Sequence, residues 1–178
     1  MKKLLLIPFL MLFSFCNCQK NSVIDTNKTT VDLKSNCPED GNCTLELLSN
    51  KTLNIKKDDL GSNYYELIDS KNTSVIVYQY KRNVKGGLKD SGYTEEVLFE
   101  INNSDKKLSL SNSDLHKVKM VFGRLCFCRG QTGYFEVTDG TLSFDNKGNE
   151  IQFDLNFKIS QVPQIINVIN ASIKKSLN

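Results

Sequence analysis

The sequence contains no tryptophan, only three prolines and a single histidine among its 178 residues. A Ser-His-Asp triad or a histidine-ligated metal centre would have to use His116, and the local sequence Asp114-Leu115-His116 specifies neither. We therefore expect His116 to lie in a surface turn. The glycine-rich stretch near residue 130 is not followed by Gly-Lys-Ser/Thr, which excludes a phosphate-binding loop.

No apolar run is long enough to span a bilayer, but a shorter one stands at the N-terminus. Lys2 and Lys3 precede an apolar run of about a dozen residues, whereas a membrane-spanning helix needs roughly 20. Two cysteines and an asparagine follow the run at positions 16–18. This order of a basic, an apolar and a small-residue region predicts a secretory signal over residues 1–18.

The cysteines at the end of the signal indicate lipid attachment. Cys18 is the favoured site, because cleavage before the alternative, Cys16, would leave the bulky Phe15 next to the cleaved bond. An acyl anchor would hold the protein at a membrane by about 0.8 kcal/mol per buried CH₂. Ordinary signal-peptidase cleavage before Gln19 is the other interpretation, and it predicts a secreted or soluble periplasmic protein.

Charge and composition indicate one exported domain on a tether. The formal net charge is +3, part of which belongs to the signal, and the remaining basic residues are interleaved with acidic ones. This distribution predicts no nucleic-acid partner. Residues 19–36 are polar and predict a flexible tether, and residues 37–178 are long enough for a single domain with a core.

Short alternating runs separated by turns predict a mainly β domain. Strict alternation over residues 151–159 is typical of a half-buried antiparallel strand, Asp139-Gly140 predicts a hairpin, and Ser49-Asn50-Lys51 is expected to turn. Glu95 and Glu96 are adjacent in an expected strand, so they should point to opposite faces, and both are expected to be solvated. The expected strands are 44–48, 52–56, 64–68, 74–80, 94–101, 107–110, 117–128, 133–137, 141–144 and 151–159.

The last residues predict a helix. Pro163 suits a first helical turn, and apolar residues recur at three- and four-residue steps at Val162, Ile166, Ile169, Ile173 and Leu177. We therefore expect an amphipathic helix over residues 162–177 that covers the sheet. The predicted fold is an antiparallel β-sandwich or open barrel of about eight to ten strands with this C-terminal helix.

Four cysteines follow the signal, and an even number in an exported chain indicates disulfides. Cys126 and Cys128 are expected in one strand, where i,i+2 Cα atoms lie about 6.5–7 Å apart, near the upper limit for a bridge. Cys37 and Cys43 could close their own turn, but that would leave Cys126 to pair with Cys128. Cross-links from Cys37 and Cys43 to that strand are therefore favoured, each closing a loop of about 85 residues. The Cys-x5-Cys and Cys-x-Cys spacings suit neither a zinc site nor a Cys-x-x-Cys redox pair, so no metal or other cofactor is predicted.

The stretch from Gly123 to Tyr134 is the best candidate for binding chemistry. Arg124 and Arg129 can act as bidentate donors to an anion or carboxylate, together with the turn at Gly130 and Gln131. The alternative is a disulfide-pinned strand followed by a glycine turn with two solvated arginines.

Three segments carry a resemblance to known sequences: Cys-Pro-Glu-Asp-Gly-Asn-Cys at 37–43, Phe-Gly-Arg-Leu-Cys-Phe-Cys-Arg-Gly-Gln-Thr-Gly-Tyr at 122–134, and Val-Pro-Gln-Ile-Ile at 162–166. They resemble uncharacterised exported proteins and lipoproteins of Bacteroidota such as flavobacteria, over most of residues 37–170. The resemblance implies a cell-envelope location and no particular activity. Cys-Gln-Lys at 18–20 resembles the start of mature lipoproteins from such bacteria, and the lack of acidic residues after it implies a periplasm-facing anchor.

These observations favour a non-enzymatic envelope lipoprotein that serves as a binding or structural module. Its expected partners are the membrane, through the lipid anchor, and another envelope protein. A small barrel that holds an apolar or anionic ligand between sheet and helix is the alternative. An enzyme is the third hypothesis, and no residue is assigned a catalytic role.

Overall fold

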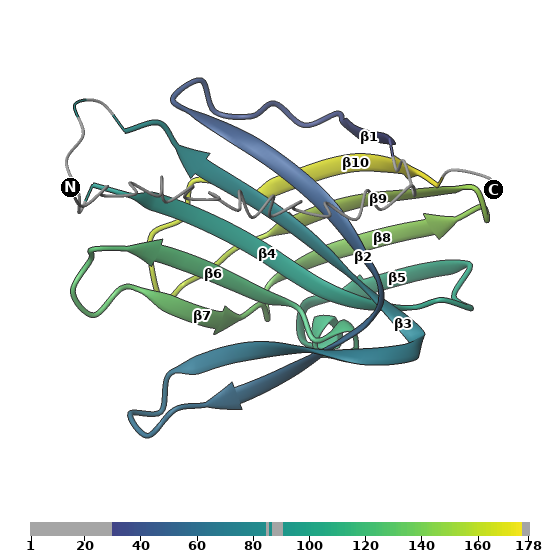
Figure 1. Ribbon diagram of the computed structural model, residues 1–178, viewed down its shortest axis with the longest axis horizontal. Helices are drawn as coiled ribbons and strands as arrows, with labels where there is room; N and C mark the ends of the chain where they lie inside the picture. Colours follow the sequence, from purple (N-terminus) through teal and green to yellow (C-terminus); the bar gives the residue numbers. More distant parts are fainter. Residues whose placement is uncertain (1–29, 85, 87–90, 176–178) are drawn as a thin grey trace, which may run out of the picture.

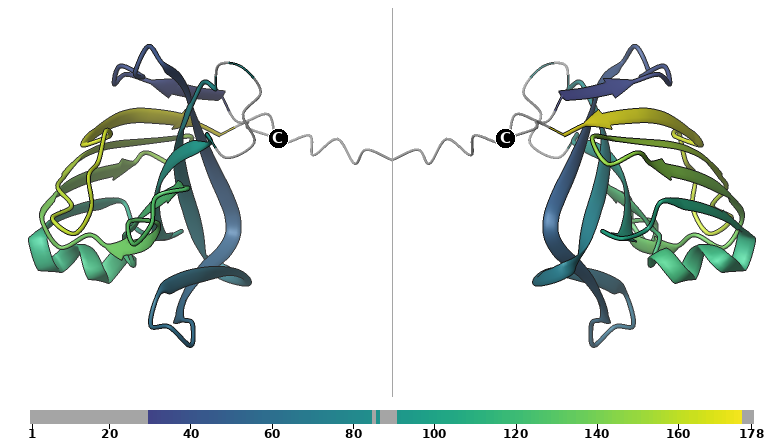
Figure 2. Two further views of the ribbon diagram at one scale, coloured as in Figure 1. Left: turned by 90° about the vertical axis from the view of Figure 1, so that its left-hand side faces the viewer. Right: turned by 90° about the vertical axis from the view of Figure 1, so that its right-hand side faces the viewer.

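The computed structural model describes residues 30–84, 86 and 91–175, and the predicted signal with Cys16 and Cys18 lies outside them. The described residues form two five-stranded antiparallel sheets that pack face to face (Figures 1 and 2). The prediction of a mainly β antiparallel sandwich is therefore confirmed. Within the described part of the chain, no helix has the length and apolar character needed to cross a bilayer.

The first sheet joins the chain's first strand to its last ones. Its order is β1 (Thr30–Leu33), β10 (Val168–Lys174), β9 (Glu150–Phe157), β8 (Gly140–Asn146) and β5 (Lys107–Ser111). The second sheet has the order β2 (Gly41–Lys57), β3 (Asn63–Arg82), β4 (Tyr93–Asn102), β6 (Val121–Cys126) and β7 (Gly133–Glu136). A 3-10 helix, η1 (Asn112–Val118), connects β5 to β6.

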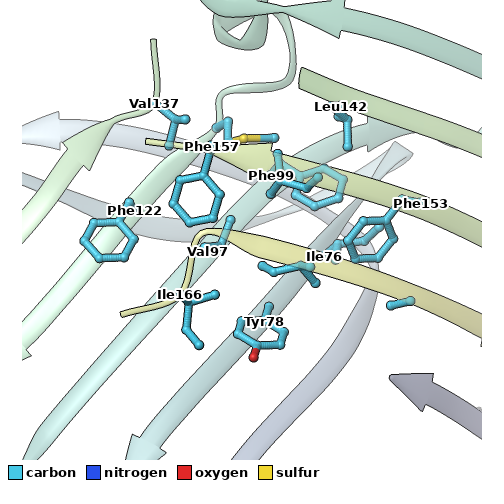
Figure 3. Close-up of a cluster of buried hydrophobic side chains, with 14 of the residues drawn as sticks. Ile76, Tyr78, Val97, Phe99, Phe122, Val137, Leu142, Phe153, Phe157 and Ile166 are labelled. Atoms are coloured by element: carbon cyan, nitrogen blue, oxygen red, sulfur yellow. The ribbon is translucent and has the colours of Figure 1, made fainter. Parts of the chain in front are cut away.

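Aromatic side chains fill the space between the sheets. The alternation predicted for residues 151–159 is confirmed in β9, whose residues Ile151, Phe153, Leu155 and Phe157 are all buried. Two ring contacts cross the sandwich edge-on or tilted, Phe99–Phe153 at 5.3 Å and Phe122–Phe157 at 5.9 Å between centroids. Figure 3 shows these four phenylalanines gathered in one cluster. Such packing is the main source of the sandwich's stability.

β2 and β3 form one long hairpin, where the sequence predicted four separate strands. Ser49-Asn50-Lys51 does not turn the chain. It forms a bulge inside β2, where Asn50 has φ 59° and the pairing changes from Ser49 opposite Ser74 to Lys51 opposite Asp69. Bulges of this kind bend a strand and increase its twist. We call the part beyond the bulge, residues 51–69, the distal hairpin; its tip extends beyond the sandwich at the bottom of Figure 1.

The distal hairpin covers part of the outer face of the second sheet. Leu53 is buried there against Val75, Leu98 and Val121. The start of β3 also pairs with β7 through Asn63 and Tyr134. This contact closes β3, β4, β6 and β7 of the second sheet into a small barrel.

The predicted C-terminal helix is wrong, because residues 168–174 form β10 between β9 and β1. Ile169 and Ile173 are four residues apart, a spacing that fits a helical face and alternate strand positions equally well. The segment forms a strand because its β-branched residues favour extended backbone and because β1 and β9 supply hydrogen bonds on both sides. Leu177 lies outside the described residues. The predicted tether over 19–36 is also wrong from Thr30 onward, because β1 belongs to the sheet.

Two further expectations about connections are corrected. Asp139-Gly140 does not close a hairpin, because β7 belongs to the second sheet and β8 to the first, so the segment crosses between sheets. The expected strand over 117–128 is divided, with η1 occupying its start and β6 beginning at Val121. Lys119 adopts φ 49°, a left-handed conformation that ends η1.

Candidate binding site at one end of the sandwich

Several loops converge at one end of the sandwich, on the left of Figure 1. We call this the loop end. Tyr93, at the start of β4, pairs with Cys126, at the end of β6, and the backbone N–H groups of Ile165 and Ile166 bind Glu95, two residues further along β4. The loop end is formed by the turn 37–43 and the loops 83–92, 127–132 and 158–167, of which residues 85 and 87–90 are not described.

Both disulfides lie at the loop end, and each is local. Cys37 is bonded to Cys43 and Cys126 to Cys128, with Cα atoms 5.8 Å and 5.2 Å apart. The predicted cross-links between the two pairs are therefore wrong. The prediction assumed an extended strand through residue 128, but β6 ends at Cys126. The turn that follows brings the two Cα atoms closer than an extended strand would.

Tyr93 connects two buried charged groups. Its hydroxyl donates to Oε1 of Glu95 at 2.5 Å and accepts from Nε of Arg124 at 3.3 Å. Glu95 also accepts from the N–H groups of Ile165 and Ile166, each at 2.7 Å. Glu95 is only 1% exposed, so the expectation that it is solvated is wrong. The loop 158–167 covers it and supplies the donors that a buried carboxylate requires.

Glu96 is buried on the other face of the sheet. The opposite orientation of Glu95 and Glu96 is as expected, but Glu96 is only 8% exposed, which contradicts the expected solvation. Its carboxylate accepts from Nε2 of Gln79 at 2.8 Å and from the hydroxyl of Tyr134 at 2.9 Å. Burial, together with the charge of Glu96, raises the pKa of Tyr134. Glu96 is thus part of the small barrel and not of the loop end.

Arg124 and Gln131, both candidates from the sequence, are bound to each other. Nη1 of Arg124 donates to the backbone oxygen of Gln131 at 3.0 Å and to its side-chain Oε1 at 3.1 Å. Arg124 is only 8% exposed. Arg129 and Gly130 lie exposed in the turn, where Gly130 has φ 71°. Arg129 donates no hydrogen bond to any described residue, so it does not belong to the Tyr93 network.

Arg82 is a member of the site that sequence reasoning missed. Its guanidinium carbon lies 4.6 Å from the centroid of the Tyr93 ring, and that of Arg124 lies 5.3 Å from it. Nε of Arg82 donates to Asp40 at 2.9 Å. Because Tyr78, Tyr80 and Arg82 alternate at the end of β3, the sequence did carry a signal that they share one face.

Asp40 holds this arginine from within the Cys37–Cys43 turn. The Tyr80 hydroxyl donates to the other carboxylate oxygen of Asp40 at 2.6 Å. This hydrogen bond, followed by the charge of Arg82, lowers the pKa of Asp40. Burial and the nearby Glu95 raise the pKa of Tyr78 to about 12. Near neutral pH, Tyr78 is therefore a neutral phenol, and its hydroxyl donates to Sγ of Cys43.

Large apolar side chains are exposed around this cluster. Phe127, between the two bonded cysteines, is 87% exposed, and Val84 and Ile165 are also exposed. An open hollow beside Phe127 is lined by Cys126, Phe127, Cys128, Arg129 and Thr132. The loop end therefore combines fixed cationic groups with apolar surface, a pairing common in binding sites.

The remaining candidate groups for chemistry lie outside this network. His116 is exposed on η1, as expected, and its Nδ1 contacts the backbone oxygen of Ser113. Among the described residues, no group of three or more histidine, cysteine or acidic side chains converges as a metal site. Comparison with known protein families, curated proteins and solved structures gives no match to this chain. Function is therefore inferred from the residues of the site.

Proposed function

We propose that this chain is an exported lipoprotein of the bacterial cell envelope, anchored through Cys18 and facing the periplasm, and that its domain is a non-enzymatic binding module. The carrying observation is the gathering of exposed apolar residues and fixed arginines at the loop end, which two local disulfides hold. Loops on a rigid β scaffold are a common position for binding residues. Another envelope protein is the proposed partner.

The direction of the chain supports a partner on the side away from the anchor. Thr30, the first described residue, pairs with Lys174 at the end of β10. β10 begins after the loop 158–167, so its last residues lie at the end of the sandwich opposite the loop end (Figure 1). We propose that the anchoring membrane lies on that side of the domain and the partner on the side of Phe127 and its neighbours.

Packing supports a surface interaction over an internal ligand. The space between the sheets is filled by side chains such as Phe99, Phe122, Phe153 and Phe157. The buried charged groups Glu95 and Arg124 are engaged in hydrogen bonds within the protein. What remains for a partner is the exposed rim of the loop end, where Phe127 offers an aromatic anchor of the kind that dominates protein interfaces.

The anchor is tested by the intact mass of the protein, expressed with its own signal in a related host. The expected product begins at Cys18 and carries a diacylglycerol and a fatty acid. The variant Cys18→Ser should abolish this modification, whereas Cys16→Ser should not abolish it. An unmodified product beginning at Gln19 would overturn the lipoprotein assignment and identify a secreted or soluble periplasmic protein.

The binding surface is tested by a photo-reactive phenylalanine analogue at position 127 in intact cells. The matched control carries the same analogue at Ser104, an exposed residue in the turn after β4 at the opposite end. We expect a discrete cross-linked envelope protein from position 127 and not from position 104. The same adduct at equal yield from both positions, or no adduct from position 127, would contradict binding at the loop end.

A further inference from the structure

We propose that the Cys126–Cys128 disulfide is a redox centre that exchanges with the thiols of a polypeptide. This inference goes beyond the proposed binding function, because it assigns a chemical step to the loop end. The bridge lies where β6 ends and its turn to β7 begins, at the left of Figure 1. Its cysteines are only 2 positions apart, whereas Cys37 and Cys43 are 6 apart. The second bridge therefore serves as an internal comparison.

Hydrogen bonds hold the turn between β6 and β7, residues 127–132, independently of the bridge. The Thr132 hydroxyl donates to the backbone oxygen of Arg124 at 3.1 Å, and the N–H of Gln131 donates to the backbone oxygen of Cys128 at 2.9 Å. The guanidinium of Arg124 also binds Gln131. A bridge over so short a separation restricts the unfolded chain little. We therefore expect the bridge to open without unfolding of the sandwich.

Both bonded cysteines border the open hollow beside Phe127. Its volume is about 380 Å³, and its lining residues are Cys126, Phe127, Cys128, Arg129 and Thr132. Thiol–disulfide exchange requires an incoming thiolate to reach one sulfur of the bridge, and exposed bridges are the ones with labile, regulatory or catalytic roles. The hollow gives the polypeptide a place to present its thiolate to this bridge.

The two cysteines of the bridge differ in their surroundings. Cys126 packs against the core of the sandwich, as do Cys37 and Cys43, and Cys128 is not among the described side chains that do so. We therefore assign Cys128 as the sulfur that is attacked and Cys126 as the sulfur that leaves. In the other bridge, the Tyr78 hydroxyl donates to Sγ of Cys43 at 3.0 Å. That bridge is bound from the core side and is the structural one.

Arg129 and Phe127 supply the groups that favour exchange with a polypeptide. Arg129 is the only charged residue among those that line the hollow. A cation beside a sulfur stabilises the thiolate that forms there and makes the disulfide easier to reduce. Phe127 is 87% exposed and offers an apolar contact to residues that flank the thiols of the polypeptide.

The exchange balances with a dithiol as its only co-reactant. One thiolate of the polypeptide bonds to Sγ of Cys128, the disulfide bond breaks, and Sγ of Cys126 leaves with the electron pair and takes up a proton. The second thiolate of the polypeptide then attacks the polypeptide's own sulfur in the mixed disulfide and releases the thiol of Cys128. The polypeptide is oxidised to a disulfide and this chain is reduced to a dithiol, so the two electrons are accounted for.

The first test compares the two bridges of the mature chain bearing Cys18→Ser in glutathione buffers of graded oxidised-to-reduced ratio. Acid quenching, alkylation and peptide mapping report the reduced fraction of each bridge. We expect the equilibrium constant for reduction of Cys126–Cys128 to be at least about a hundredfold larger than that for Cys37–Cys43, which corresponds to about 60 mV. The circular-dichroism spectrum should stay native when only the first bridge is reduced. Equal constants, or easier reduction of Cys37–Cys43, would overturn the proposal and leave the binding module intact.

The second test measures how fast the oxidised chain forms the disulfide of a reduced peptide that carries two cysteines flanked by leucines. Phe127→Ser should slow this reaction by about fivefold or more and change reduction by glutathione by less than about twofold, because glutathione has no apolar side chain. Arg129→Gln should slow both reactions by about threefold or more. The control Lys158→Gln removes an exposed cation that does not line the hollow, and it should change neither by more than about twofold. Equal losses in Arg129→Gln and Lys158→Gln, or no effect of Phe127→Ser on the peptide, would overturn the assigned roles.

The third test traps the mixed disulfide and identifies the reactive sulfur. Cys126→Ser retains the thiol of Cys128 and lacks the cysteine that would release a bound peptide. With the oxidised peptide, it should therefore accumulate at least about fivefold more mixed disulfide than Cys128→Ser, whose remaining thiol packs against the core. Intact mass under acid quench measures both. The reverse preference would overturn the assignment of Cys128, and no adduct from either variant would overturn the exchange.

Discussion

Glu95 and Arg124 are directly opposed on β4 and β6, and the hydroxyl of Tyr93 joins them in place of an ion pair. Both charged side chains are largely buried. A buried charge is costly unless it is hydrogen-bonded, and here one phenol hydroxyl supplies a hydrogen bond to each of the two charged groups. Tyr93 therefore determines how the charged groups of the loop end are held.

Replacement of Tyr93 by phenylalanine tests this role. Tyr93→Phe removes one donor from Glu95 and one acceptor from Arg124, so the free energy of unfolding should fall by about 1–3 kcal/mol. Urea denaturation measures the change. Tyr64→Phe is the matched control, because Tyr64 is exposed on the distal hairpin, and it should stay within about 0.5 kcal/mol of the native protein. Equal losses in the two variants would contradict a special role for the Tyr93 hydroxyl.

Glu100 and Lys119 attach the distal hairpin to the sandwich. Nζ of Lys119 donates to Glu100 at 2.8 Å and to the backbone oxygen of Leu53 at 3.0 Å, while Glu100 also accepts from the N–H of Leu53 at 2.8 Å. Burial acts to raise the pKa of Glu100, but the hydrogen bonds from Lys119, Thr52 and Leu53 outweigh it and lower the pKa below the usual 4.5. The ionised carboxylate is therefore more stable in the folded than in the unfolded protein.

This lowered pKa predicts a loss of stability in acid. The unfolded chain binds a proton at Glu100 near pH 4.5, before the folded chain does, so the stabilisation is complete above that pH and falls as the pH drops towards the folded pKa. Glu100→Gln should lower the free energy of unfolding at pH 7 and reduce its decline below pH 4.5. Urea titrations at several pH values measure both. An unchanged acid slope in Glu100→Gln would contradict the assignment.

The sequence predicted elements whose pattern is local and missed those set by distant contacts. Residues 151–159 alternate strictly, and no helical pattern competes with that alternation. Ile169 and Ile173 fit two periods, and only pairing with β9 and β1 decides between them. A bulge joins two expected strands into β2, and the distal hairpin beyond it packs against Leu98 and Val121, contacts that no local pattern reveals.

The residues of the candidate site show the same contrast between local patterns and distant contacts. Arg124 and Gln131 are seven residues apart in one distinctive block, and they were predicted as parts of one site. Arg82 and Asp40 are separated by 42 positions and meet only because β2 and β3 pair. The burial of Glu95 depends on a loop 70 residues away. Residues brought together over such distances leave no mark on local sequence.

The strand β1 supplies a further test. It precedes residue 37, where the sequence predicted the domain to begin, and it pairs with β10. Val31 and Leu33 pack against the core, and β1 supplies one hydrogen-bonding neighbour of β10. A chain that begins at residue 34 should therefore lose about 2–4 kcal/mol of stability relative to one that begins at residue 30. It should also aggregate more readily, because the edge of β10 becomes exposed. Thermal unfolding and light scattering compare the two, and equal behaviour would show that β1 is dispensable.

The two disulfides supply the last test, because their local pairing changes how much each can contribute. A non-reduced peptide map should recover Cys37 with Cys43 and Cys126 with Cys128. Bridges over such short separations restrict the unfolded chain little, so each double cysteine-to-serine variant should lose about 1.5–2.5 kcal/mol, against about 4–5 kcal/mol for a bridge over some 85 residues. Denaturant unfolding distinguishes these values. The Cys126→Ser, Cys128→Ser variant should in addition reduce cross-linking from the analogue at position 127, because the bridge encloses that residue, whereas a loss confined to stability would assign the bridge a structural role only.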